Sequence, residues 1–205
     1  MFWDKISPLY DIFENIYNGR VYIRTGKKVA ELIKPSDVVL ECACGTGAIS
    51  IYIAQKCKRL IATDFASGML RQAAKKCRNY PNVVFRKADI TNIKCKDAHF
   101  DKVVAGNVIH LLPEPEKALR ELERVVKPNG EIIIPTYINM SKGTGTAAVK
   151  FISLLGADFK RQFNLESYKK FFEDKGYTGV DYYVIDGRMP CAIAVIKRSK
   201  TPVRS

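Results

Sequence analysis

Residues 41–50 read E-C-A-C-G-T-G-A-I-S, and this stretch decides the fold that the chain is expected to adopt. It extends a β-branched run that begins at Val38, which predicts a strand, and it continues into a turn that contains Gly45 and Gly47. A glycine-rich turn between a strand and a helix lets backbone N–H groups and the helix N-terminus approach a ligand closely. The stretch therefore predicts the opening unit of an α/β fold with a ligand at its turn.

From residue 37 onward, short β-branched runs alternate with segments of helical period, as expected for βαβ units and a parallel sheet. A link that contains Asp186 and Gly187 joins the last two runs, which predicts a hairpin and an antiparallel final strand. The predicted strands are 38–40, 59–63, 83–85, 100–105, 131–134, 177–185 and 191–197, and the predicted helices between them are 67–77, 114–126 and 166–174.

The composition indicates an ordinary globular protein of one domain, since 47% of the 205 residues are hydrophobic and 27% are charged. No apolar run is long enough to cross a bilayer, and residues 1–5 do not begin a signal peptide, so a cytoplasmic location is expected. The six cysteines are expected to be free thiols. Because His99 and His110 are not spaced with any cysteine pair like zinc ligands, no metal site is expected.

The formal net charge of +13 is compatible with attraction to RNA, to anionic lipid or to an acidic metabolite. The basic residues are spread through the chain and lack the aromatic interleaving of a platform for single-stranded nucleic acid. We therefore expect the charge to serve general solubility, with a small molecule favoured as the partner and a nucleic acid as the alternative.

Three acids stand at the ends of three consecutive predicted strands, namely Glu41, Asp64 and Asp89. A nicotinamide fingerprint would place a third glycine at position 50, where the chain has Ser50. A carboxylate at Glu41 would repel a diphosphate and attract an ammonium group. Asp64 lies where an acid accepts the hydroxyls of an unphosphorylated ribose, and Asp89 suits an adenine amino group. The expected ligand is a zwitterion that carries a nucleoside.

With these acids the sequence resembles the class I S-adenosylmethionine-dependent methyltransferases. The resemblance covers about residues 36–136, with V-V-L-E-C-A-C-G-T-G, A-T-D-F-A-S-G-M-L, K-A-D-I, F-D-K-V-V-A-G-N-V-I-H-L-L and L-E-R-V-V-K-P-N-G-E-I-I-I in the family's order. It implies a Rossmann-like, doubly wound sheet of seven strands, mostly parallel with an antiparallel strand from the C-terminal hairpin. It also implies S-adenosylmethionine as the cofactor and S-adenosylhomocysteine as the product.

The resemblance assigns roles to individual positions. It implies that Glu41 lies next to the methionine end of the cofactor and that Asn107 borders the same portion. The remaining implied cofactor contacts are the turn residues Ala43, Gly45 and Gly47, the ribose acid Asp64, the adenine-side residues Phe65 and Met69, and the adenine contacts Asp89 and Ile90.

Two departures concern the choice of branch within the family. Ala43 stands where most members have the first glycine, and this alanine, with Tyr10 and Asp11 near the N-terminus, is similar to the quinone-biosynthesis and small-molecule branch. The Arg-Asn pair of that branch after the fourth strand is replaced by residues 106–110, G-N-V-I-H. The sequence therefore favours a small-molecule acceptor without specifying a quinone.

The chain is expected to divide into functional segments within one methyltransferase domain. Residues 1–34 are predicted to form an N-terminal helical lid and 36–136 the cofactor-binding core. Residues 137–163 form a predicted insertion or substrate region, and 164–198 the C-terminal helix and hairpin.

Methyl transfer from a sulfonium is an in-line displacement, so the protein is expected mainly to align the acceptor and to exclude water. His110, just after the fourth strand, is the candidate base, and Tyr10 is predicted to close over the cofactor. Methylation of RNA or another polyanion is the alternative, although no Asp-Pro-Pro-Tyr or Asn-Pro-Pro-Tyr motif follows the fourth strand. A third possibility is a protein that binds the cofactor only to regulate a partner.

Overall fold

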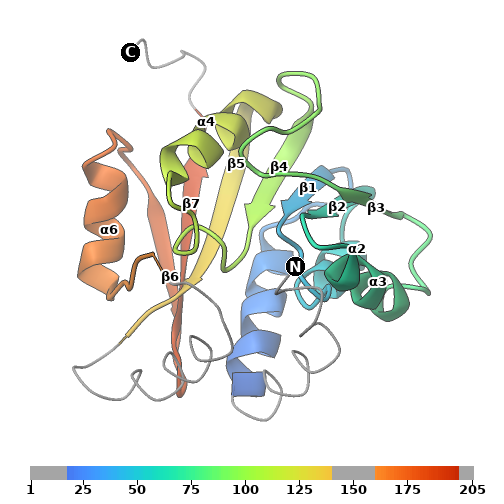
Figure 1. Cartoon of the computed structure of the whole chain (residues 1–205), viewed down its shortest axis with the longest axis horizontal. Helices are drawn as coiled ribbons and strands as arrows, with labels where there is room; N and C mark the ends of the chain where they lie inside the picture. The colour runs from blue at the N-terminus through green and yellow to red at the C-terminus, as the bar shows by residue number, and fades with distance from the viewer. Residues whose placement is uncertain (1–17, 140–159, 199–205) are drawn as a thin grey trace.

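The computed structural model describes residues 18–139 and 160–198, in which seven strands form one sheet in the order β3-β2-β1-β4-β5-β7-β6 (Figure 1). Neighbouring strands are parallel from β3 to β5, whereas β7 is antiparallel to both β5 and β6. The predicted fold class and the predicted antiparallel hairpin are confirmed. The strands are β1 Val38–Cys42, β2 Arg59–Asp64, β3 Val83–Lys87, β4 Phe100–Ala105, β5 Val126–Tyr137, β6 Asp181–Ile185 and β7 Cys191–Lys197.

Helices cover both faces of the sheet (Figure 1). They are α2 Ser50–Ala54, α3 Ser67–Lys76, α4 Pro115–Val125, α6 Leu165–Glu173 and, in the described part of the chain, a helix at 18–31 that we call the N-terminal helix.

Each face of the sheet has its own apolar core. Val39 and Leu60 pack with residues of the N-terminal helix, α2 and α3, whereas Leu40 and Val103 pack with residues of α4 and α6. Adjacent residues of β1 thus serve opposite cores, because successive strand side chains point to opposite faces.

The local sequence explains the helix boundaries. Pro115 occupies the first turn of α4, where its missing N–H costs no hydrogen bond. At the start of α6, Asn164 Oδ1 accepts a bond from the Ser167 amide at 2.7 Å, and Ser167 Oγ accepts one from the Asn164 amide at 2.9 Å. This reciprocal cap satisfies two amides that would otherwise lack partners.

β5 begins five residues earlier than the predicted strand at 131–134. Its pairing with β4 shifts between Phe100 and Lys102, and Pro128, Asn129 and Gly130 lie in the irregular part of the strand. Asn129 takes a left-handed conformation there, with φ +64°. A proline, an asparagine and a glycine in succession are unfavourable inside a strand, so the sequence pattern alone does not predict this part of β5.

The strand order reverses between β1 and β4, and this switch point positions the site. The first crossovers lead from β1 outward to β2 and β3, and the chain then returns to pair β4 with the other side of β1. Helices on the two sides of such a point diverge, and a crevice opens at the carboxyl ends of the strands. Glu41 and Cys42 lie at that end of β1.

Some predictions lie outside the described residues. Tyr10, half of the predicted lid at 1–34 and most of the predicted insertion at 137–163 lie there. Of the helices in the described ranges, none combines the length and apolarity needed to span a membrane.

Candidate functional site

A cavity of about 360 Å³ lies at the switch point, between the ends of β1, β2 and β4 and the segment after β3. Its volume falls within the usual range of small-molecule sites. Nine of the positions predicted from the sequence line it, namely Glu41, Ala43, Gly45, Asp64, Phe65, Met69, Asp89, Ile90 and Asn107. The structure therefore brings together residues that are up to 66 positions apart in the chain, from Glu41 to Asn107.

The turn after β1 uses its small residues in different ways. Ala43, Gly45 and Gly47 all have left-handed backbones, with φ values of +53°, +55° and +82°. A Cβ on Gly45 would meet nothing within 4 Å, whereas a Cβ on Gly47 would lie 2.9 Å from Cα of Ala73 in α3. Gly45 thus keeps the cavity wall open, and Gly47, which does not line the cavity, lets α3 pack closely against the turn.

Ala43→Gly is expected to stabilise the protein, because an L-residue in the left-handed region is strained by about 1–2 kcal/mol and glycine is not. Part of this gain is lost to the greater entropy of glycine in the unfolded chain, which leaves a net increase of about 0.5–1 kcal/mol in the free energy of unfolding. Urea denaturation measures the change. The control is Ala74→Gly, since Ala74 is an exposed residue inside helix α3, where glycine is less favourable than alanine, and this variant should lose stability; equal losses in both variants would contradict the prediction.

Asp64 ties this turn to the start of α3. Its Oδ2 accepts a hydrogen bond from the Gly45 amide at 2.9 Å, and its Oδ1 accepts one from the Ala66 amide at 2.8 Å. A carboxylate offers about four acceptor positions, so these backbone bonds are compatible with further bonds to ligand hydroxyls. The acid therefore organises the cavity wall and presents a negative charge within it.

Glu41 is a buried acid at the base of the cavity. The Ser50 hydroxyl donates a hydrogen bond to the Glu41 carboxyl group, with 2.5 Å between Ser50 Oγ and Glu41 Oε2. Burial removes water from the charged form and raises the pKa of Glu41 to about 8, and the nearby charge of Asp64 adds to this effect. Without a cationic ligand the carboxyl group is therefore largely protonated near pH 7.

Asn107 faces the same cavity from the end of β4. The backbone of Asn107 is left-handed, with φ +52°, and its backbone N–H donates a hydrogen bond to the carbonyl of Pro135 at 2.8 Å. Its Oδ1 is buried without a hydrogen-bond partner among the described residues. A buried oxygen without a partner costs free energy, so Asn107 and Glu41 together suit a ligand group that donates hydrogen bonds and carries positive charge.

The other end of the cavity is shaped by Phe65, Met69, Asp89 and Ile90. Met69 is buried, whereas Phe65 is 51% exposed, which is unusual for a large apolar side chain. Asp89 Oδ1 accepts bonds from the amide and the hydroxyl of Thr91, both at 2.8 Å, so this acid also shapes its own loop. The apolar side chains beside a carboxylate are suited to the flat face and the polar edge of a ring.

His110 does not line the cavity. Its side chain is 6% exposed, and burial lowers the pKa of the imidazole to about 4, so it is neutral near pH 7. Its carbonyl accepts a bond from the Arg161 amide at 3.1 Å. A catalytic role for His110 stays a prediction, and the neighbouring Leu111 and Leu112 form part of the wall instead.

Several lining residues were missed by the sequence reasoning. Val108, Leu111 and Leu112 make an apolar wall after β4, and Tyr22 contributes from the N-terminal helix. The leucines stand within the motif of the fourth strand, but their apolar character gave no chemical signal. Tyr22 could be found only from its place in space.

The two cysteines of the opening stretch, Cys42 and Cys44, are buried. Cys42 is 1% exposed and Cys44 7% exposed, although Cys44 contributes to the cavity wall. Burial raises the pKa of the Cys42 thiol to about 12 and also raises that of Cys44 well above its usual value. Both thiols are therefore poor nucleophiles in this environment.

Residues 40–134 match a family model described as a methyltransferase domain. The demethylmenaquinone methyltransferase of Renibacterium salmoninarum is 29% identical over 143 residues, which cover 69% of this chain and 59% of that protein. The enzyme of the same name from Clavibacter sepedonicus is 32% identical over 136 residues, or 64% of this chain and 55% of that protein. The chain thus spans less than two thirds of the length of these relatives.

Solved structures share the fold over nearly the whole chain. A methyltransferase from Thermotoga maritima, described as a possible histamine N-methyltransferase, has a TM-score of 0.73 and 17% identity, with coverage of 97% of this chain and 98% of that one. A Methanococcus maripaludis protein described as a putative S-adenosylmethionine-dependent methyltransferase has a TM-score of 0.72 and 18% identity, with coverage of 100% and 97%. At these identities the likeness concerns the fold alone.

Proposed function

We propose that this chain, whose residues 40–134 match a methyltransferase domain, is a class I S-adenosylmethionine-dependent methyltransferase that binds S-adenosylmethionine in the switch-point cavity and methylates a small molecule. The observation that carries the proposal is that Glu41 and Asn107 both line one end of the cavity, while Asp64 and Asp89 lie toward the other end. Acceptors for an ammonium group and acceptors for hydroxyl or amino hydrogens thus line one concave site.

The residues present fit this cofactor. Glu41 and the Oδ1 atom of Asn107 would receive the ammonium group, which would give the buried amide oxygen of Asn107 a partner. Asp64 would accept the ribose hydroxyls, and Phe65, Met69 and Ile90 would pack on the adenine, with Asp89 near its amino group. The open backbone at Gly45 would leave room for close approach of the ligand.

When bound, S-adenosylmethionine supplies an electrophilic methyl group on a positively charged sulfur. The contribution of this chain is to hold that group near the end of β4 and to exclude water. The apolar wall of Val108, Leu111 and Leu112 would form the drier part of the cavity. His110, whose imidazole is neutral near pH 7, is our candidate for accepting a proton during the transfer.

We infer that the acceptor is a small apolar molecule. The wall after β4 is apolar, and the relatives in the comparison are methyltransferases named for demethylmenaquinone, which is consistent with a ring acceptor. No observation in the described residues specifically favours RNA. Transfer of an isotopically labelled methyl group to compounds of a metabolite extract would identify the acceptor; labelling of RNA alone would contradict the inference.

Calorimetric titration with S-adenosylmethionine near pH 7 is expected to detect binding with release of close to one proton. The proton comes from Glu41, whose raised pKa falls when the ammonium group binds beside it. Titrations in buffers of different ionisation enthalpy measure the release. NADH is the control ligand, and tight binding of NADH without a response to S-adenosylmethionine would refute the assignment of the cofactor.

A further inference from the structure

A second concave site lies on the sheet face that α4 and α6 cover. The crossovers from β1 to β2, from β2 to β3 and from β4 to β5 each contain a helix, whereas the segment from β3 to β4, residues 88–99, contains none (Figure 1). This segment, here called the β3–β4 loop, lies over β1, β2 and β3 and leaves a groove of about 950 Å³ beneath it.

The floor of the groove is apolar. Val38 of β1 and Ile61 of β2 line it with half-buried side chains, together with the buried side chains of Leu40, Ile93 and Phe100. Val38 and Leu40 are two residues apart in β1, and Ile61 of β2 is paired with Leu40, so these three side chains share one face of the sheet. A ligand part that contacts this floor must be apolar.

The rim of the groove is basic. Lys58, Arg59, Arg86, Lys87 and Lys94 all contribute to its lining, and all are exposed. Within the described ranges none of these five pairs with a carboxylate; Lys94 Nζ contacts Asn92 Oδ1 at 3.0 Å, and Lys87 Nζ lies 5.8 Å from the centre of the Phe65 ring. The acid in the lining is Asp89, whose Oδ1 is engaged by Thr91.

Elsewhere in the molecule many cations are paired. Within residues 18–139 and 160–198, eight lysine or arginine side chains form ion pairs with Asp or Glu, namely Lys28, Lys102, Lys117, Arg124, Lys127, Lys170, Lys175 and Lys197. The five rim cations face one concave surface whose lining contains a single carboxylate, that of Asp89, so positive charge is in excess around the groove. This excess creates a potential that attracts an anion.

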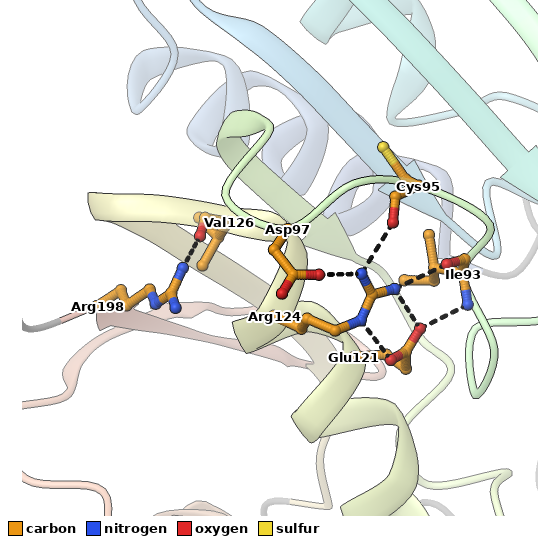
Figure 2. A network of polar contacts seen from close by, with 7 residues as sticks. All are labelled: Ile93, Cys95, Asp97, Glu121, Arg124, Val126 and Arg198. Carbon is orange, nitrogen blue, oxygen red and sulfur yellow. Dashed lines mark hydrogen bonds and ion pairs between the residues drawn. The ribbon is translucent and has the colours of Figure 1, made fainter. Parts of the chain in front are cut away.

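The wall of the groove is held in place by Arg124 of α4 (Figure 2). Its guanidinium donates to the carbonyls of Ile93 and Cys95, each at 2.8 Å, and to Asp97 Oδ1 at 2.6 Å. Glu121 accepts hydrogen bonds from Arg124 Nε at 2.7 Å and from the Ile93 backbone amide at 2.7 Å. The carboxylates of Glu121 and Asp97 raise the pKa of Arg124 above its ordinary value. The loop is thus fastened to α4, and the groove exists before a ligand arrives.

We propose that this groove binds an amphiphilic organic anion, a molecule with an apolar ring system or short chain and a phosphate, sulfonate or carboxylate group. The apolar part lies on the floor and the anionic group lies among the rim cations. A polyanion without an apolar part would leave the floor unmatched. A bilayer surface matches poorly as well, because the apolar residues lie below the charged rim of a concave surface.

The groove is distinct from the site of methyl transfer. It meets the switch-point cavity at Phe65, Ala88 and Asp89, which is the end opposite to Asn107 in the proposed placement of the cofactor. A molecule in the groove is therefore an additional ligand and not the methyl acceptor. Its binding is measured on the protein alone, so the outcome does not depend on the proposed function.

Cys95 provides a site-specific readout. It lines the groove and is half-buried, whereas Cys42, Cys44, Cys57, Cys77 and Cys191 are buried. The rate of alkylation of Cys95 by iodoacetamide, followed by mass spectrometry, should fall several-fold when the probe 1-anilinonaphthalene-8-sulfonate is present. The uncharged analogue N-phenyl-1-naphthylamine should protect it less at the same concentration.

A matched pair of variants tests the charge. Arg86→Glu combined with Lys94→Glu should weaken protection of Cys95 by the sulfonate about tenfold or more, since two favourable charges become repulsive. Lys27→Glu combined with Lys96→Glu makes the same change in net charge, and Lys96 lies on the same loop outside the groove lining. This control should change protection less than about twofold.

Three results would overturn the proposal: no protection of Cys95 by the sulfonate, equal loss of protection in both pairs of variants, or equal protection by the neutral analogue. Protection by phosphatidylglycerol vesicles in place of the free probe would assign the surface to a membrane. Protection by a short RNA that the sulfonate cannot reproduce would assign it to nucleic acid. Either of these last results would also reject the amphiphilic small molecule.

Discussion

Glu41→Gln is expected to bind S-adenosylmethionine about 10- to 100-fold more weakly than the wild-type protein near pH 8, yet to unfold at a higher temperature at alkaline pH. The first effect follows because a charge-assisted hydrogen bond to the ammonium group, which contributes about 1.5–3 kcal/mol, is lost. The second follows because glutamine has no charge to desolvate, while its side-chain oxygen can still accept the bond from Ser50.

The sign of the pH dependence follows from the pKa of Glu41. Its value in the folded protein, about 8, lies above the ordinary value of 4.5, so the folded state holds the proton more tightly. The stability of the wild-type protein relative to Glu41→Gln is therefore highest below about pH 4.5, falls as the pH rises toward 8 and is lowest above it.

Thermal unfolding of the two proteins at about pH 5 and pH 9, paired with calorimetric binding, measures both effects. The difference between the two melting temperatures is the quantity to compare, because other groups titrate equally in both proteins. A constant difference across this range would mean that Glu41 is charged in the folded protein without ligand. Unchanged affinity would remove Glu41 from the cofactor site.

Gly45→Ala and Gly47→Ala are expected to separate binding from stability. Both residues have a positive φ, so each alanine carries about 1–2 kcal/mol of backbone strain. At Gly47 the new methyl group would also lie 2.9 Å from Cα and 3.0 Å from Cβ of Ala73, and overpacking of this kind adds about 1–3 kcal/mol. At Gly45 the methyl group meets open space on the cavity wall.

Gly47→Ala should therefore lose about 2–5 kcal/mol of the free energy of unfolding, and Gly45→Ala only about 1–2 kcal/mol. The affinity for S-adenosylmethionine should fall more in Gly45→Ala, because its methyl group intrudes where the ligand approaches the backbone. Urea denaturation and calorimetric binding on both variants provide the two measurements. If the larger stability loss occurred at Gly45, the close packing between the turn and α3 would not be the reason for the glycine at position 47.

Much of the sheet could be predicted because its signals are local. The runs at 59–63 and 100–105 alternate with helices of regular period, and the structure places strands there with ends that differ by one residue or none. The second half of β5 was also predictable from the β-branched run at 131–134. Its first half was not, because the bulge that admits Pro128 and Gly130 depends on pairing with β4.

The candidate site was predictable to the extent that its residues have distinctive chemistry. Glu41, Asp64 and Asp89 are acids at strand ends, and the parallel topology brings strand ends to one edge of the sheet. Leu111 and Tyr22 carry no such signal, and they line the cavity because of how the elements pack. His110 has the chemistry of a base, but it does not line the cavity, because the conformation of the loop after β4 places Leu111 and Leu112 there instead.

The sequence by itself determined the order of the strands, the glycine turn and the acids at the ends of the first three strands. These features depend on side-chain periodicity, turn propensity and chemical type, which are properties of neighbouring residues. The tertiary structure alone decided that Glu41 is buried and holds its proton to about pH 8, that Ala43 is left-handed, and that the β3–β4 loop leaves a basic groove. Burial, dielectric environment and the shape of a surface arise from contacts between segments distant in the chain, and no local pattern records them.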